Sequence, residues 1–140
     1  MSDSITFTVL GVPVPQGSMR GIVVDGKARM LSDNEKTGPF RQEVGWCALR
    51  ALEGREQPFC AKHVPVWVRI MFVFPKPVSA KKSRQRPVVK PDADKLIRSC
   101  FDAMKGIMWH DDAQIVSVLA QKYYGTPARA EITVMKEEPL

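Results

Sequence analysis

The sequence contains no apolar run that approaches the roughly 18 residues needed to cross a bilayer. Neither end carries a lipidation motif, and the start, Met1-Ser2-Asp3-Ser4, lacks the basic and apolar regions of a secretion signal. These absences argue against membrane attachment and export. We therefore expect a cytoplasmic protein.

Cysteine and histidine are also scarce, with three Cys and two His residues. Cys47, Cys60 and Cys100 are an odd number without C-x-x-C spacing, which argues against both a disulfide framework and a zinc knuckle. His63 and His110 are too scattered for a zinc motif. We expect the thiols to be buried packing residues.

Acidic residues are absent from 75–90, a segment that contains three prolines and six cations. We expect an exposed, mobile loop. Such a charge run is often only solvated, but beside a functional site it would attract DNA phosphates and gain affinity by counterion release. The net charge of +6 and the pI of about 9.4 also favour a polyanionic partner, with nucleic acid the foremost candidate. The six cations are Lys76, Lys81, Lys82, Arg84, Arg86 and Lys90.

The chain of 140 residues is long enough for one domain with a substantial core, and a hydrophobic content of 44% agrees. Alternating or β-branched runs predict strands over 5–14, 64–74, 114–124 and 129–135, and the Asp25-Gly26 pair predicts a tight hairpin. Helical spacing of apolar residues predicts helices over about 38–53 and 93–105. The expected fold class is α+β, a single mixed β-sheet packed with two main helices. Phe7, Trp67, Phe72 and Phe74 alternate on the strands and are expected to pack in the core.

Four carboxylates lie in two short segments, Asp92 and Asp94 in the first and Asp111 and Asp112 in the second. A hard cation such as Mg²⁺ binds one or two carboxylates and keeps positions open for water and phosphate. An acidic cluster inside a basic protein therefore suggests a site for a metal ion and a phosphate.

Structural roles remain open for the same residues. Asp92 could cap the second helix, with Asp94 a first-turn acid favoured by the helix dipole. Asp111 and Asp112 could simply turn the chain between helix and strand. Trp109 could be a wedge that stacks on DNA bases, or it could belong to the core.

The two acidic segments resemble the RusA family of Holliday-junction resolvases. The similarity is to a K-P-D-x-D-N-L pattern followed, beyond a helix, by W-x-D-D-x-Q-[IV]. A weaker similarity extends to Gly11-Val12-Pro13-Val14-Pro15-Gln16-Gly17 and Arg20. The matching residues of the two acidic segments are Lys90, Pro91, Asp92, Asp94 and Leu96, then Trp109, Asp111, Asp112, Gln114 and Ile115.

The resemblance implies that Asp92, Asp94 and Asp112 are catalytic metal ligands, with Asp111 secondary, for Mg²⁺ or a substituting Mn²⁺. Two positions depart from the family pattern. Lys95 replaces an Asn, and Arg98 replaces a Lys that is often catalytically important. Arg98 is four residues beyond Asp94 and shares its helical face, so it can contact the scissile phosphate or form an ion pair with Asp94 or Asp102, but it cannot donate a proton as Lys might. Asp102 is expected to be structural.

The resemblance to RusA, together with the acidic and basic segments, implies a Mg²⁺-dependent endodeoxyribonuclease that resolves four-way DNA junctions by paired symmetric nicks, in a bacterial or phage-infected cell. Two nicks need two sites, and one cluster per chain implies a C2 homodimer. The alternatives are a non-catalytic DNA-binding accessory protein of the same fold and a general metal-dependent nuclease or RNase. The predicted DNA contacts are the six cations of 75–90 together with Arg20, Lys27 and Lys95, beside a second candidate surface that adds Gln16, Ser18 and Arg29.

Overall fold

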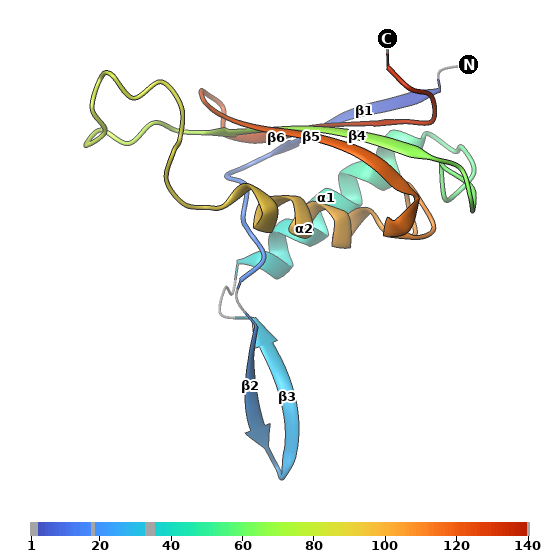
Figure 1. The fold of residues 1–140 in the computed structure, drawn as a ribbon, viewed down its shortest axis with the longest axis horizontal. Coiled ribbons are helices and arrows are strands. Elements are labelled where there is room, and N and C mark those ends of the chain that lie inside the picture. The colour runs from blue at the N-terminus through green and yellow to red at the C-terminus, as the bar shows by residue number, and fades with distance from the viewer. Residues whose placement is uncertain (1–2, 18, 33–35, 140) are drawn as a thin grey trace.

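A computed structural model describes residues 3–17, 19–32 and 36–139. Four strands form one mixed sheet in the order β1-β6-β4-β5, and both long helices lie on one side of it (Figure 1). The fold class is therefore α+β, as predicted. The strands are β1 (Ser4–Leu10), β4 (Val66–Phe74), β5 (Ile115–Tyr124) and β6 (Arg129–Met135), and the helices are α1 (Thr37–Leu52) and α2 (Ala93–Met104).

Alternation of side chains along the strands explains why the helices cover only one face of the sheet. Ile5, Phe7 and Val9 of β1 are buried, and so are Ala130, Ile132 and Val134 of β6. The residues between them point to the other face, where the Thr6 and Thr133 hydroxyls lie 3.0 Å apart. Of the four aromatic residues expected to pack, Phe7, Phe72 and Phe74 are buried and Trp67 is half-buried.

The direction of β5 is set by the helix that precedes it. β4 is antiparallel to β6 but parallel to β5, and the chain between β4 and β5 includes α2. A parallel pair requires such a crossover, because the chain must return to the end of the sheet from which β4 began. The start of β5 therefore lies beside the start of β4, with Ile115 opposite Val66.

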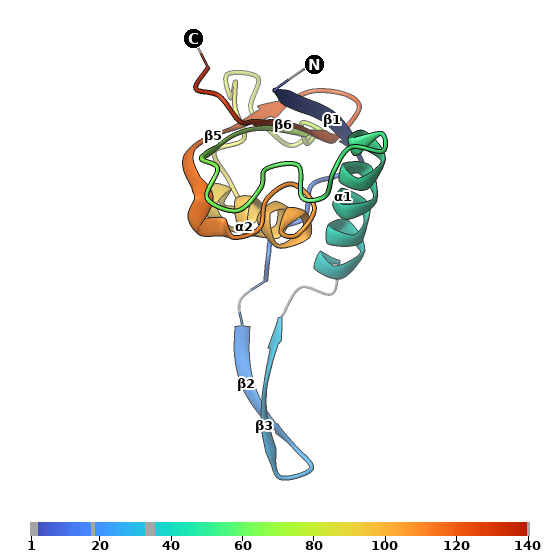
Figure 2. The ribbon, with the colours of Figure 1, turned by 90° about the vertical axis from the view of Figure 1, so that its right-hand side faces the viewer.

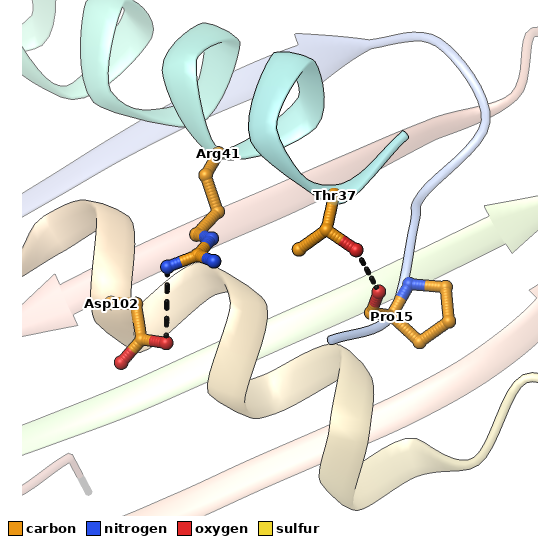
Figure 3. Close-up of polar contacts among 4 residues, drawn as sticks. All are labelled: Pro15, Thr37, Arg41 and Asp102. Atoms are coloured by element: carbon orange, nitrogen blue, oxygen red, sulfur yellow. Dashed lines mark hydrogen bonds and ion pairs between the residues drawn. The ribbon is translucent and has the colours of Figure 1, made fainter. Parts of the chain in front are cut away.

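Helix α1 agrees with its predicted range to within one residue at each end. Its buried residues recur at helical spacing, and the chain ends the helix with Glu53 and Gly54 at positive φ. Arg41 forms an ion pair of 3.4 Å with Asp102 of α2, and the Thr37 hydroxyl donates to Pro15 O at 2.8 Å (Figure 3). Asp102 thus has the structural role expected for it.

The core also contains the cysteines and the tryptophan of the second acidic segment. Cys60, Cys100 and Trp109 are fully buried, and Cys47 is half-buried. Burial raises the pKa of Cys100 to about 12 and that of Cys60 to about 11, which keeps both thiols protonated and unreactive. The edge of Phe101 meets Trp109 at a centroid distance of 5.4 Å. These residues pack, as the simpler interpretation predicted.

Strands β2 (Met19–Val24) and β3 (Lys27–Ser32) form a separate two-stranded sheet. Val24 pairs with Lys27 across the predicted two-residue loop, and Asp25 and Gly26 both have positive φ, as a type I′ turn requires. The hairpin projects away from the sheet and helices (Figures 1 and 2). Within the described ranges, no helix is long and apolar enough to span a membrane.

The remaining boundaries follow local chemistry. β1 ends at Leu10, four residues earlier than predicted, because the Pro13 and Pro15 nitrogens cannot donate to a neighbouring strand. The Gly11 amide makes the last bond of this edge, to Ala128 O at 2.9 Å. β6 has the predicted bounds, and β5 begins one residue later than predicted, after a short 3-10 helix, η1 (Asp112–Gln114).

Candidate metal and DNA-binding site

Two carboxylates lie at the N-terminal end of α2. Asp92 occupies the N-cap position with extended backbone (φ −71°, ψ 139°), and its carbonyl accepts the Leu96 amide at 3.1 Å. Its carboxylate, however, makes no capping hydrogen bond. Asp94 is exposed in the first turn. Neither carboxylate forms an ion pair within the part of the chain that the structure describes. Capping therefore does not explain the Asp92 side chain.

Asp111, by contrast, has a clear structural role. Its Oδ1 accepts the Ala113 amide at 3.0 Å, and the Gln114 side chain accepts the Asp111 amide at 2.8 Å, which completes a capping box at η1. The Ala113 amide lowers the pKa of Asp111 below its ordinary value. The turn-forming interpretation thus accounts for this residue.

Asp112 is held by the core. The indole Nε1 of the buried Trp109 donates to Asp112 Oδ1 at 2.7 Å, and Asp112 itself is half-buried. A charge-assisted bond of this length fixes one carboxylate oxygen and leaves the other available. Sequence reasoning treated Trp109 and Asp112 separately. Their separation of three residues was the signal that could have linked them.

The structure places Asp112 at the opposite end of α2 from Asp92 and Asp94. The 12 residues of α2 span about 18 Å, and the segment after it folds back on the last turn, where the Met108 amide donates to Met104 O. Figure 1 shows the N-terminal end of α2 next to loop 75–90 and its C-terminal end next to the turn into β5. Among the described residues, no three Asp, Glu, His or Cys side chains form a group suited to hold a metal ion.

A groove of about 640 Å³ opens beside Asp92. One wall comes from residues 86–90 and the other from Ala120, Gln121 and Lys122 of β5. Three cations, Arg86, Lys90 and Lys122, line this groove together with one acidic residue, Asp92. That combination suits a phosphate and a cation bound together.

The basic loop is attached to β5 by its own cations. The Arg86 guanidinium lies 3.7 Å from the Tyr123 ring centroid and donates to Lys122 O at 3.1 Å. Lys76 and Arg84 lie 5.8 and 5.9 Å from the centroid of the Tyr124 ring. Lys81, Lys82 and Lys90 are exposed, with their charges available to a partner. The Tyr123-Tyr124 pair was a signal in the sequence for this docking, and sequence reasoning did not use it.

Lys122 is a further residue that sequence reasoning missed. Its Nζ donates to Val89 O and to Pro91 O, both at 2.8 Å. No local motif marks this lysine, because its contacts lie about thirty residues away in the chain.

The other predicted site residues that the structure describes do not line this groove. Arg98 is exposed, and the expected alternative partner Asp102 is paired with Arg41 instead. Lys95 is half-buried, and its carbonyl accepts the Gln16 amide at 3.0 Å.

Lys27 is exposed in the hairpin loop region. Arg20 and Arg29 are placed on β2 and β3 by their backbone. The predicted Ser18 contact lies outside the described residues.

Residues 11–135 match the family described as endodeoxyribonuclease RusA, which is most of the chain. The protein therefore belongs to the RusA family of endodeoxyribonucleases. Membership implies endonuclease activity of the Holliday-junction-resolving kind.

The chain is also similar to YqaN, an uncharacterised protein of Bacillus subtilis (strain 168). The two are 34% identical over 140 residues, which covers 94% of this chain and 96% of the relative.

Proposed function

We propose that this protein is a Mg²⁺-dependent endonuclease, with Mn²⁺ as a substitute, that resolves four-way DNA junctions by paired symmetric nicks. The observation that carries the proposal is a pair of carboxylates that form no ion pair among the described residues. Asp92 lines a groove together with Arg86, Lys90 and Lys122, and Asp94 is exposed two residues further on. A protein that only bound DNA would gain nothing from free anions there. This activity belongs in the cytoplasm of a bacterial or phage-infected cell.

The donor set at the N-terminal end of α2 fits a hard cation. Mg²⁺ is commonly held by one or two carboxylates and by substrate phosphates, and it keeps several waters. Asp92 and Asp94 would supply the protein ligands. When bound, the ion would activate water and neutralise charge on the phosphodiester. Asp111 would have at most a secondary part, because its carboxylate caps η1.

The third predicted ligand, Asp112, is the residue that a dimer would supply. Within one protomer, Asp112 lies at the opposite end of α2 from Asp92 and Asp94. In a twofold dimer whose two α2 helices run in opposite directions, the N-terminal end of α2 in one protomer would lie beside the C-terminal end of α2 in the other. Asp112 of the second protomer would then lie near Asp92 and Asp94 of the first. Each dimer would then contain two complete sites, as two nicks require.

Strand β5 offers a surface for this dimer. It is an edge strand, paired only with β4 in the described sheet. Val116, Val118 and Leu119 are 59%, 40% and 49% exposed. Edge strands are normally protected by charge or by short length, so three exposed apolar side chains on this strand indicate a partner. The homodimer would cover them.

DNA binding would use the residues that remain exposed around the groove. Lys81, Lys82 and Lys90 would contact backbone phosphates, which position the substrate without reading sequence. Arg98 lies one helical turn beyond Asp94 and would contact the phosphate as a fixed charge. Selectivity for junctions would come from backbone shape and deformability.

A cleavage assay tests the proposal directly. Four-way junction, duplex, single strand and RNA are offered side by side with Mg²⁺ or with EDTA, and Asp92→Asn is the inactive control. Junction cleavage by paired nicks with Mg²⁺ alone is the expected result. Equal cleavage of all DNA or RNA substrates would favour the general nuclease. Junction binding without cleavage would favour the accessory protein.

A further inference from the structure

The residue that fixes the position of Asp92 comes from a strand distant in sequence. Lys122 lies in β5 opposite Phe72 of β4, and its side chain reaches from the sheet to the segment that enters α2. There its Nζ donates to Val89 O and Pro91 O, at 2.8 Å each. Both acceptors lie within three residues of Asp92.

The bond to Pro91 O acts directly on Asp92. The Pro91 carbonyl and the Asp92 nitrogen belong to the same planar peptide unit, so fixing the oxygen orients the main chain of Asp92. No capping bond of the Asp92 side chain contributes to this orientation. Asp92 and Lys122 also line the same groove.

A second attachment supports the first. The carbonyl of Lys122 accepts the Arg86 guanidinium at 3.1 Å, and Arg86 covers the Tyr123 ring. The loop is thus joined to two adjacent residues of β5, both before and after the exposed Val88. Contacts with β5, and not α2 alone, therefore hold the segment that contains Asp92 in place.

Among the described residues, no carboxylate neutralises the charge of Lys122. Both acceptors of its ammonium group are carbonyls. An ammonium group has three donors, so one N–H remains for another acceptor.

We propose that Lys122 is a positioning residue, which orients the Asp92 carboxylate for the metal ion and the scissile phosphate. This inference rests on the proposed function, because it assigns Asp92 to the metal. Residues that orient metal ligands typically change metal affinity or activity by about 10–100-fold when removed.

The test compares Lys122→Met, which keeps the aliphatic stem, with Lys122→Arg, which keeps donors and charge. Lys81→Met is the matched control, because it also removes one lysine charge, from the loop 75–90, without touching residues 89–91. We expect Lys122→Met to raise the Mg²⁺ concentration for half-maximal cleavage about tenfold. Lys122→Arg should need a Mg²⁺ concentration close to that of the wild type. Lys81→Met should weaken junction binding and leave the Mg²⁺ requirement unchanged.

Two measurements test the role of Lys122 independently of DNA cleavage. Mn²⁺ titration of the free protein, followed by electron paramagnetic resonance, should show weaker binding by Lys122→Met than by Lys81→Met. Hydrogen exchange of the Leu96 amide, which is bonded to Asp92 O, should be faster in Lys122→Met. If Lys122→Met does not fold, Lys122→Gln replaces it, and it should need more Mg²⁺ than Lys122→Arg.

The possible failures are distinguishable. Wild-type protein that cleaves with Mg²⁺, while Lys122→Met needs no more Mg²⁺ than wild type, would refute the role of Lys122 and leave the proposed function intact. An equal rise in the Mg²⁺ requirement for Lys81→Met would also refute it, since general charge would then explain the effect. Wild-type protein that neither binds Mn²⁺ nor cleaves would overturn the proposed function and this inference together.

Discussion

The two ends of α2 carry carboxylates in different states. At the N-terminal end, Asp92 makes no capping bond and Asp94 is exposed, whereas at the C-terminal end Asp111 and Asp112 each accept a hydrogen bond from the protein. The groove that contains Arg86, Lys90 and Lys122 lies beside Asp92. An acidic residue without a protein partner on a cationic surface is available to a ligand, while one that caps a turn is already used.

The two carboxylates of the second pair also differ from each other. Asp111 accepts its bond from the local backbone, which is the ordinary task of an N-cap residue. Asp112 accepts from a fully buried indole, which gives the carboxylate a fixed orientation at the surface. In the proposed dimer, Asp112 would therefore serve the metal site of the second protomer, whereas Asp111 caps η1.

The largest expected effect comes from removing a proposed metal ligand. Asp92→Asn, Asp94→Asn and Asp112→Asn should each reduce junction cleavage by more than about a hundredfold, because even residues that only orient metal ligands cost about 10–100-fold. Junction binding should be equal or tighter, since an anion leaves the DNA surface. Cleavage and gel-shift assays measure both quantities. Asp102→Asn, which removes only the ion pair with Arg41, should keep most activity. Cleavage near the wild-type rate by any one of the three variants would remove that residue from the metal site.

The next effect tests whether Trp109 orients Asp112. Trp109→Phe removes the indole donor and keeps an aromatic ring, and we expect about a tenfold loss of cleavage. Phe101→Leu is the control, because Phe101 packs against Trp109 and does not contact Asp112 by any bond described. Both variants should lose stability, which thermal unfolding measures. Equal activity of the two variants would mean that Trp109 acts only through packing.

The basic loop should give a smaller, graded effect. Neutralising Lys81, Lys82, Arg84 and Arg86 together should weaken binding to junction and duplex DNA alike. The slope of log K against log salt should become shallower by about 0.9 for each phosphate that the loop no longer neutralises. Because Arg84 and Arg86 also contact tyrosine rings, the pair Lys81 and Lys82 is a cleaner variant. An unchanged slope would show that the loop is solvated and does not touch DNA.

The smallest expected effect concerns the pH dependence contributed by Asp111. Its pKa is lowered in the folded protein, mainly by the bond from the Ala113 amide, so the ionised form stabilises the fold. This contribution is complete above the unfolded pKa, about 3.9, and is lost as pH falls through the lower folded value. Wild type should therefore melt slightly above Asp111→Asn at neutral pH, and the difference should vanish in strong acid. Thermal unfolding at several pH values measures this, and a difference that grows on acidification would contradict it.

Sequence patterns predicted the elements well because those patterns are local. Buried Val44, Ala48 and Leu52 at helical spacing located α1, and the Asp25-Gly26 pair located the hairpin loop. The position of the hairpin outside the main sheet was not predictable in the same way, because β2 and β3 pair only with each other in the described sheets. Which strand a hairpin joins depends on contacts that no local pattern encodes.

The sequence located the acidic residues of the candidate site but not their arrangement in space. The two acidic segments were recognisable, but they lie at opposite ends of α2, so one chain does not bring all the carboxylates together. Lys122 was not predictable either, because its carbonyl partners belong to the loop before α2. Side chains that act across the sheet become visible only when the strands are placed.

Mixed dimers test most directly the claim that each metal site combines opposite ends of α2 from two protomers. Asp94→Asn and Asp112→Asn are each inactive alone, but a dimer of one with the other keeps one complete site, formed by Asp92 and Asp94 of the Asp112→Asn protomer and Asp112 of the Asp94→Asn protomer. On a cruciform plasmid, wild type should produce linear DNA, and the mixture, after subunit exchange, should produce nicked circles. A mixture as inactive as each variant alone, with exchange verified, would contradict the shared site, because carboxylates confined to one chain leave no complete set in that dimer.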